Sequence, residues 1–347
     1  MAYTDIDKPS DYFNTKLYTG NGSSGHAITG VGFQPDWIWI KDRGATNWHS
    51  VRDSVRGTSR QLFTNETRAE ETASYVTAFN SDGFTLGTGN TDVNANNNTY
   101  ASWNWKAGTS FTNDASSTGI GSIDSTGSVN TDAGFSIMTY TGTGSNATFA
   151  HGLSAVPKVA IFKDRSSTGY WMTYHQAVGN GANLVLNTSD ASSASSVWWN
   201  STSPTSSVFS IGTSSNINVS GRNYVGYLFA EKQGYSKFSS YVGTGVDSGT
   251  FSFCGFKPSF VLTKRTDTSG SWVIQDNKRP GYNETSLDLN PNNSEAEETN
   301  NGIDMLSNGF KQRNTDAHTN ASGGTYIYMA FAEQPFVTSS GVPATAR

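Results

Sequence analysis

The chain has 347 residues and a formal net charge of −5; 15% of its residues are charged and 12% are aromatic. This length suits two or three domains rather than one ordinary β-sandwich, and the aromatic content excludes a chain that is disordered by composition. The negative charge and the absence of a basic stripe exclude a protein that grips nucleic acid through clustered lysine and arginine.

The cysteine content and the hydropathy of the sequence exclude two further classes. The single cysteine, Cys254, rules out an internal disulfide framework and a cysteine-based zinc site. It lies in the apolar run FSFCGF, which favours a small buried side chain over a nucleophile. No apolar run approaches the roughly 20 residues of a membrane span, and the N-terminus has no apolar signal core. We therefore expect synthesis in the cytoplasm, without a signal peptide or membrane insertion.

One pattern of aromatic, proline and lysine residues occurs three times along the chain. In each copy a proline follows the opening tyrosine after 17 positions, and a lysine follows that proline after 6. The repeating unit is about 100 residues long, which is too long for a solenoid unit. It indicates a whole β-sandwich that has been copied twice. The matching residues are Tyr18, Tyr140 and Tyr241; Pro35, Pro157 and Pro258; Lys41, Lys163 and Lys264; Trp48, Trp171 and Trp272; and, where the closing segment begins, Tyr100, Tyr224 and Tyr326.

The local pattern predicts β-strands in every copy. The runs WIWI, VAIF and FVLT before the three lysines are continuously apolar, as expected for central strands. A proline two positions earlier can start such a strand but cannot lie inside it. The closing segment alternates, so Tyr100 should lie on one face and Trp103 and Trp105 on the other.

Turn and helix signals are consistent with this class. Asp-Gly at 82–83 and Asn-Gly at 308–309 predict hairpin turns. The best helical candidate is the stretch 65–76, which would make two or three turns at most. We therefore predict an all-β chain of three tandem homologous β-sandwich domains of the jelly-roll or lectin type.

The repeats also predict the domain boundaries. The first domain, a candidate anchoring unit, spans residues 1–108, and a Gly/Ser/Thr-rich linker comes next at 109–131. The second domain spans 132–233, the third spans 234–336, and 337–347 form a short tail. Because almost no spacer separates the second and third domains, these two should be rigidly docked.

No motif predicts an enzyme, a cofactor or a metal site. The segment GNGSSG at 20–25 matches the dinucleotide fingerprint, but the next residues, HAITGVGF, cannot open the helix that the fingerprint requires, so we interpret it as a turn. Ser154 in GLSAV lacks the final glycine of a nucleophile elbow. The five histidines have no metal-ligand spacing, and we interpret His49 and His175 as parts of a shared fold.

Acidic residues gather in similar loops of the first and third copies. Paired carboxylates cleave glycans in glycoside hydrolases, but the second copy has Asp190 and serines in this loop. Solvated loops are the favoured interpretation, and a weak calcium site is the alternative. The residues are Glu66, Glu70 and Glu71 in the first copy, and Glu295, Glu297 and Glu298 in the third.

Trp198 and Trp199 are the candidate receptor- or glycan-binding residues. Neither of the other copies has such a pair. Because only one of two adjacent side chains in a strand can face the core, the other can serve as a platform for the apolar face of a sugar or for a partner protein. Packing, or a contact between domains, is the alternative.

The sequence resembles virion proteins of bacteriophages, many of them marine. The resemblance covers about residues 9–336 and is carried by DYFNTKLYTGNG, GVGFQPDWIWIKDR and YASWNWKAG in the first copy. In the others it is carried by DAGFSIMTYTGTGSNATFAHGLSAVPKVAIFKDR, VLTKRTDTSGSWVIQDNKR and NASGGTYIYMAFAEQPF. Proteins of this kind are generally labelled tail-fibre or structural proteins. The resemblance implies a non-enzymatic virion component that contacts other virion proteins and a glycan or protein receptor on the host.

A tail-fibre or receptor-binding appendage is the leading interpretation. A capsid decoration protein or a fibre-tip knob is an alternative, because the chain has no collagen-like repeat, coiled-coil stalk or tail-anchor domain. A lectin-like carbohydrate-binding protein outside a virion is a second alternative, because it would share the sandwiches and the aromatic residues. A polysaccharide depolymerase is the least favoured, because this sequence shows no carboxylate pair. We expect a homotrimer on the particle, because linked weak sites gain avidity and closed symmetry protects edge strands.

Overall fold

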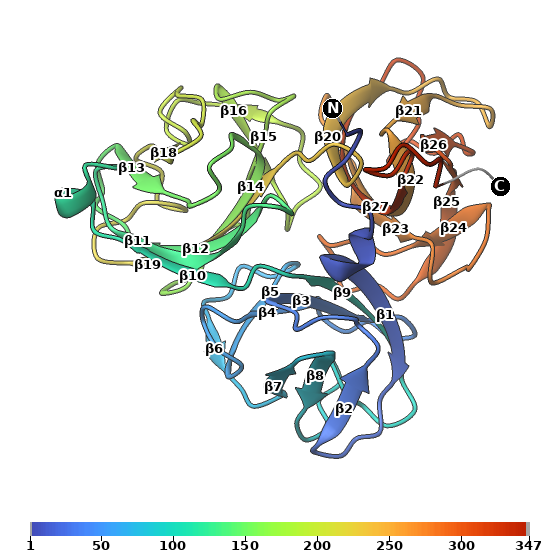
Figure 1. Cartoon of the computed structure of the whole chain (residues 1–347), viewed down its shortest axis with the longest axis horizontal. Coiled ribbons are helices and arrows are strands. Elements are labelled where there is room, and N and C mark those ends of the chain that lie inside the picture. The colour runs from blue at the N-terminus through green and yellow to red at the C-terminus, as the bar shows by residue number, and fades with distance from the viewer. Residues whose placement is uncertain (1, 345–347) are drawn as a thin grey trace.

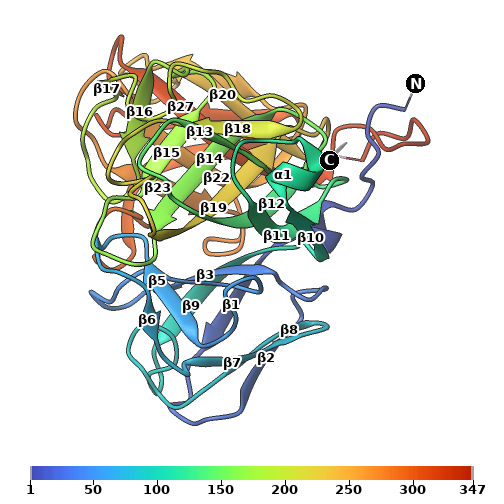
Figure 2. The same cartoon turned by 90° about the vertical axis from the view of Figure 1, so that its left-hand side faces the viewer.

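A computed structural model describes residues 2–344 of the protein, and its regular secondary structure is almost entirely β-strand, which confirms the all-β class. The strands form three pairs of sheets that follow one another along the chain and surround a common centre (Figure 1). We call them the first (residues 13–105), second (109–230) and third (236–335) sheet pair. In each pair an inner sheet faces the centre and an outer sheet packs on its far side; Figure 2 shows the first pair beneath the other two.

Each inner sheet is built around the two strands that the repeat predicts. The apolar run and the closing segment pair antiparallel in all three cases: β3 with β9, β14 with β19, and β22 with β27. The inner sheet of the first pair has the spatial order β1 (Phe13–Thr19), β9 (Thr99–Trp105), β3 (Trp37–Asp42), β4 (Ser50–Asp53), β5 (Arg60–Phe63) and β6 (Glu71–Thr72). The inner sheet of the second pair has the order β10 (Thr109–Asn113), β11 (Ser125–Asn130), β12 (Phe135–Thr141), β19 (Asn223–Ala230), β14 (Pro157–Asp164), β15 (Met172–His175), β16 (Ala182–Val185) and β17 (Ser193–Ala194). The inner sheet of the third pair has the order β20 (Ser236–Val242), β27 (Thr325–Pro335), β22 (Phe256–Arg265) and β23 (Trp272–Asp276).

The outer sheets are smaller and contain the predicted hairpins. Asp-Gly at 82–83 joins two strands of the first pair, and Asn-Gly at 308–309 joins two strands of the third, as predicted. The outer sheets are β2 (His26–Thr29), β8 (Gly83–Leu86) and β7 (Val76–Asn80); β13 (Ala147–Ala150) and β18 (Val208–Ile211); and β21 (Phe251–Phe253), β26 (Gly309–Gln312), β25 (Glu298–Leu306) and β24 (Thr285–Asp288).

The central strands are apolar on both faces because both faces are covered. In β3, Ile38 and Ile40 point into the core between the two sheets of the first pair, whereas Trp37 and Trp39 point towards the other pairs. The closing strand β9 alternates as predicted, with Tyr100 on the first of these faces. Side chains alternate across a strand, so a run without a polar residue indicates two buried faces rather than one.

The faces directed at the centre form one aromatic core that all three sheet pairs share. Trp37 of the first pair stacks on Tyr227 of the second, with ring centroids 4.4 Å apart. Phe13 of the first pair stacks on Phe331 of the third at 5.1 Å. Phe229 of the second pair meets Phe331 at 5.8 Å. Aromatic pairs contribute stability beyond that from the area that they bury. The shared aromatic core therefore contributes substantially to the stability of the fold.

The pairs contact one another in a closed cycle, and one backbone hydrogen bond recurs at each junction. In each case the N–H of a loop residue beyond β5, β16 or β24 donates to a backbone carbonyl at the end of a central strand of the neighbouring pair. Contacts of this head-to-tail kind close into a ring when the rotation allows it. The three bonds run from Glu70 to Arg165 (3.0 Å), from Ser192 to Thr266 (3.0 Å) and from Glu297 to Arg43 (2.8 Å).

The acidic loops lie at two of these junctions, so their interpretation as solvated loops is wrong for Glu70 and Glu297. The Glu70 carboxylate accepts two hydrogen bonds from Arg165 of the second pair, at 2.9 and 3.0 Å, and one from Arg56 at 3.0 Å. The Glu297 carboxylate is held in the same way by Arg43 and Arg279. These two carboxylates are therefore committed to arginines instead of being free to bind calcium.

Residues 109–131 are not a linker. They form β10, the short helix α1 (Ala115–Thr118) and β11, and the two strands extend the inner sheet of the second pair beyond β12. Three apolar residues of the segment, Phe111, Ile123 and Val129, pack on the core of that pair. Serine and threonine are compatible with the edge of a sheet, so their abundance here did not indicate a flexible chain.

Three local predictions also need correction. Residues 65–76 contain β6 and no helix, because their backbone bonds to the second pair, as Glu70 does, rather than to itself. Pro258 lies inside β22 instead of before it, at a point where the pairing with β27 is irregular and a proline is tolerated. In the predicted tail, 337–347, the N–H of Ser339 donates to the Asp7 carboxylate near the N-terminus, and positions 345–347 lie outside the described residues. A 3₁₀ turn, Pro9–Asp11, precedes β1.

Candidate functional site

The two tryptophans predicted to bind a receptor or glycan lie between β17 and β18, and the prediction is wrong for Trp199 alone. Trp199 is fully buried in the core of the second sheet pair, and its Nε1 donates to the carbonyl of Ala182 at 2.8 Å. Trp198 is half-buried against the same core. A ring enclosed by protein cannot stack on a sugar, so Trp199 is a packing residue; the role of Trp198, which keeps part of its surface exposed, stays a prediction.

Two further sequence candidates have ordinary structural surroundings. Cys254 is buried between β21 and β22, and burial raises the pKa of its thiol to about 12. It is therefore protonated at neutral pH and is not a nucleophile. Ser154 lies in the loop between β13 and β14, where a strand comes after it rather than the helix of a nucleophile elbow.

Three histidines are buried as neutral side chains. Burial lowers the pKa of His151 and of His175 to about 4, and it lowers the pKa of His49 well below its ordinary value. His49 precedes β4 whereas His175 ends β15, so the two do not occupy equivalent positions. In each ring Nδ1 accepts an N–H and cannot take a proton without losing that bond; the donors are Trp39 Nε1 for His49, Leu153 N for His151 and Ala177 N for His175.

We expect His175 to make the protein less stable in acid. Its pKa is lower in the folded chain than in the unfolded one, so its contribution is fully present above about pH 6.5 and is lost as the pH falls towards 4. When the pH is lowered from 7 to 4.5, the free energy of unfolding should fall in both proteins, but the fall in the wild type should exceed that in His175→Gln by about 2–3 kcal/mol. Urea denaturation at both pH values measures this difference, with His26→Gln, a less buried histidine, as the control. An equal fall in His175→Gln and wild type would contradict the assignment.

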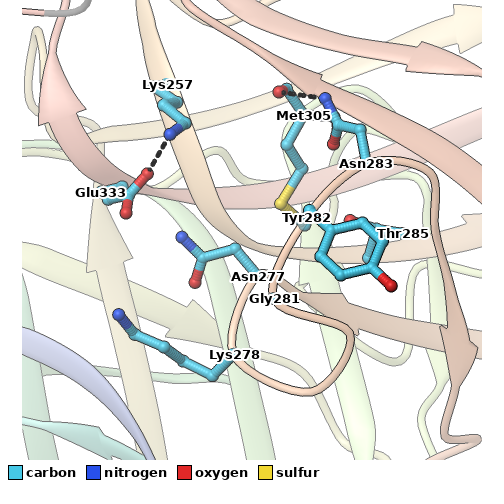
Figure 3. Close-up of a pocket in the computed structure, with 9 residues that line it drawn as sticks. All are labelled: Lys257, Asn277, Lys278, Gly281, Tyr282, Asn283, Thr285, Met305 and Glu333. Atoms are coloured by element: carbon cyan, nitrogen blue, oxygen red, sulfur yellow. Dashed lines mark hydrogen bonds and ion pairs between the residues drawn. The ribbon is translucent and has the colours of Figure 1, made fainter.

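A pocket of about 310 Å³ opens on the third sheet pair (Figure 3). It lies between the loop 277–284 and three strands, to which Lys257 of β22, Met305 of β25 and Glu333 of β27 belong. This volume is at the small end of the range for ligand sites in proteins. The lining residues are Lys257, Asn277, Lys278, Gly281, Tyr282, Asn283, Thr285, Met305 and Glu333.

The loop 277–284 is fixed at both ends. At its start the Asp276 carboxylate accepts hydrogen bonds from the backbone N–H of Lys278, at 3.0 Å, and of Arg279, at 3.1 Å. At its end the Asn283 side-chain amide donates to Met305 O at 3.0 Å and accepts from Met305 N at 2.9 Å. Tyr282 stands between these anchors with 80% of its surface exposed. The loop therefore presents an aromatic ring to solvent from a fixed backbone.

The polar groups of the pocket can both donate and accept hydrogen bonds. Lys257 and Glu333 form a half-exposed ion pair at 2.7 Å. Lys278 is exposed and makes no ion pair with any residue in the range 2–344. Asn277 Oδ1 is buried and has no hydrogen-bond partner within the described chain, although a buried acceptor usually has one. Figure 3 shows these groups on one side of the pocket and the Tyr282 ring on the other.

The sequence contains a signal for this site that the repeat comparison did not use. The corresponding loops of the first and second pairs, residues 54–59 and 176–181, are shorter and carry no aromatic residue. The loop of the third copy is two residues longer and contains Pro-Gly-Tyr-Asn at 280–283. Because the other two loops carry no aromatic residue, this difference points to the third sheet pair as the location of a site.

Two other cavities are less suited to a ligand. One, of about 360 Å³, lies beside Phe111 and Ile120 in the second pair, and another, of about 490 Å³, lies beside Tyr12 and Lys106 where the first and second pairs meet. The aromatic residue in each is largely packed, unlike Tyr282. Within residues 2–344 no group of three or more His, Cys, Asp or Glu side chains is arranged to hold a metal ion. None of the described helices is long and apolar enough to cross a membrane.

Comparison with known proteins identifies one family. A family model described as a domain of unknown function (DUF7483) matches residues 8–335, nearly the whole chain. No curated protein and no solved structure matches the chain.

Proposed function

The chain belongs to this family, and because the family's description assigns no activity, we propose a function from the residues themselves. The protein is a non-enzymatic component of a bacteriophage particle, of the tail-fibre or receptor-binding kind, and its third sheet pair contacts a glycan on the host surface. The particle is its place of action, and other virion proteins hold it there. The resemblance of residues 9–336 to phage virion proteins supports the first part of this proposal.

The observation that carries the glycan contact is the exposed ring of Tyr282 beside a polar pocket. Sugars present an apolar face of C–H groups and a rim of hydroxyls, which suits an aromatic surface next to hydrogen-bonding groups. Because the loop is fixed by Asp276 and Asn283, little conformational entropy is lost when the ring is covered.

The pocket supports binding rather than cleavage. A glycoside hydrolase uses two carboxyl groups that flank the scissile bond. Among the residues that line this pocket, Glu333 is the single carboxylate, and Lys257 is paired with it at 2.7 Å. We therefore propose that the protein holds a glycan without cutting it.

The proposed architecture is three tandem homologous β-sandwich domains. Two observations support it: the inner sheets use the same two strands in each pair, and the same backbone hydrogen bond recurs at the three junctions. The proposed assembly on the particle is a homotrimer. Because the Tyr282 loop occurs in the third copy alone, one chain offers one such pocket, and several chains are needed to gain avidity from weak sites.

Competition with phage adsorption tests the receptor-binding part of the proposal. We expect purified protein, added to host cells before the phage, to lower the rate of adsorption, and Tyr282→Ala to lower it much less. Tyr170→Ala is the matched control, because Tyr170 is also an exposed tyrosine, at 46%, but lies in the second sheet pair. Adsorption that the wild-type protein leaves unchanged at concentrations that saturate the cell surface would refute a receptor-binding role.

A further inference from the structure

The pocket beside Tyr282 has a charge preference as well as a shape. We propose that it binds an acidic sugar, one that carries a carboxylate or a sulfate group, and this inference rests on the proposed glycan contact. Among its lining residues there are two lysines and one glutamate. The pocket is therefore locally positive, in a chain whose formal net charge is −5.

The positive charge that is available to a ligand belongs to Lys278. The Lys257 ammonium is already neutralised by Glu333 at 2.7 Å, whereas Lys278 makes no ion pair within residues 2–344. Its backbone is fixed by the bond from its N–H to Asp276, so its side chain starts from a defined position. An anion held there forms a charge-assisted hydrogen bond, which is roughly twice as strong as one between neutral groups.

The exposed ring of Tyr282 favours a sugar over a simple anion. A phosphate or sulfate ion has no apolar face, so it would leave this ring uncovered. The ligand that matches both groups has an anionic substituent for Lys278 and an apolar ring face for Tyr282.

The shared chemistry is an anionic pyranose, and its two sources, a uronic acid and a sulfated sugar, are separated by experiment. Isothermal titration calorimetry of the full chain uses three probes: a trisaccharide of galacturonic acid, a sulfated trisaccharide of galactose and the neutral trisaccharide of galactose. We expect at least one acidic probe to bind about tenfold or more tightly than the neutral one. Its affinity should fall as sodium chloride is raised from about 0.05 M to about 0.5 M, because this partly exposed interaction is screened.

Two variants connect the binding to the pocket. Lys278→Gln should weaken the acidic probe by about tenfold to a hundredfold, as expected for a hydrogen bond to a charged group, and leave the neutral probe unchanged. Tyr282→Ala should weaken all the probes that bind, by about fivefold or more. The matched control, Lys158→Gln, removes a lysine of the second sheet pair that lies outside this pocket and should change nothing. Lys278 and Tyr282 are exposed, so both variants are expected to fold.

The outcomes separate this inference from the proposal on which it rests. If the neutral probe binds as tightly as the acidic ones and Tyr282→Ala abolishes that binding, the glycan contact stands and the preference for acidic sugars is refuted. If an acidic probe binds and Lys278→Gln does not weaken that binding, the anion does not lie at Lys278 and its assigned position is refuted. Absence of binding to all three probes refutes both the acidic preference and a glycan contact for sugars of this size.

Discussion

Trp105→Ala should lower the free energy of unfolding by about 3–5 kcal/mol, the usual cost of removing a buried tryptophan. Trp105 is 1% exposed and lies where all three sheet pairs meet. Its ring centroid is 4.4 Å from that of Trp37, 5.8 Å from that of Phe260 and 5.7 Å from that of Phe331. The cavity would therefore have walls from more than one pair, and closing it would require the pairs to move relative to each other.

The same substitution tests whether the shared core makes the chain unfold as one unit. Far-ultraviolet circular dichroism and tryptophan fluorescence should follow a single transition in urea for both wild type and Trp105→Ala. Trp198→Ala, which removes a half-buried tryptophan of the second pair, is the control and should cost clearly less. Separate transitions for separate parts of the chain, with Trp105→Ala affecting one alone, would show that the centre is not a common core.

Arg56→Met should also cost about 3–5 kcal/mol, because it leaves buried carboxylates without their partner. The Arg56 side chain is fully buried and binds Asp53 at 2.5 Å and Glu70 at 3.0 Å. It is part of the junction with the second pair, since the hydroxyl of Tyr227 donates to the same Asp53 carboxylate at 2.7 Å. Methionine has a similar volume but no charge, so the loss measures mainly the electrostatic contacts and hydrogen bonds of the guanidinium group.

The chain contains both a replicate and a control for this prediction. Arg279 makes the equivalent contacts at the junction of the third and first pairs, with Asp276 at 2.7 Å and Glu297 at 3.1 Å, so Arg279→Met should cost a similar amount. Arg68→Met removes an ion pair between side chains that are 50% and 37% exposed, and should change the stability by less than about 1 kcal/mol. A cost for Arg56→Met no greater than that for Arg68→Met would overturn the role of the junction. Urea denaturation followed by fluorescence gives all three values.

The strands could be predicted from the sequence because each copy repeats the same local physics. WIWI, VAIF and FVLT are continuous apolar runs, and each became a central strand paired with its closing segment. The sequence shows that both faces of each strand are apolar. It does not show that one face packs on the outer sheet of the same copy and the other face on the other two copies. The arrangement around a shared centre depends on contacts between residues more than a hundred positions apart, such as Trp37 with Tyr227.

The errors come from residues whose role is decided by distant partners. Glu70 is a charged residue in a polar loop, and only the approach of Arg165 makes it part of a junction. Trp199 is in a serine-rich segment that suggests exposure, yet it packs into the core of the second pair. Tyr282 shows the opposite case: the repeat comparison used positions that match between the copies, and the loop of Tyr282 differs from its counterparts in length and composition.

The most direct test of the central claim, that this protein is a component of a phage particle, is mass spectrometry of density-gradient-purified virions from the phage that encodes it. The account predicts peptides from all three sheet pairs in the virion fraction, at an abundance comparable with that of other minor structural proteins. Peptides found throughout the soluble fraction of the infected cell, and absent from the particles, would contradict it.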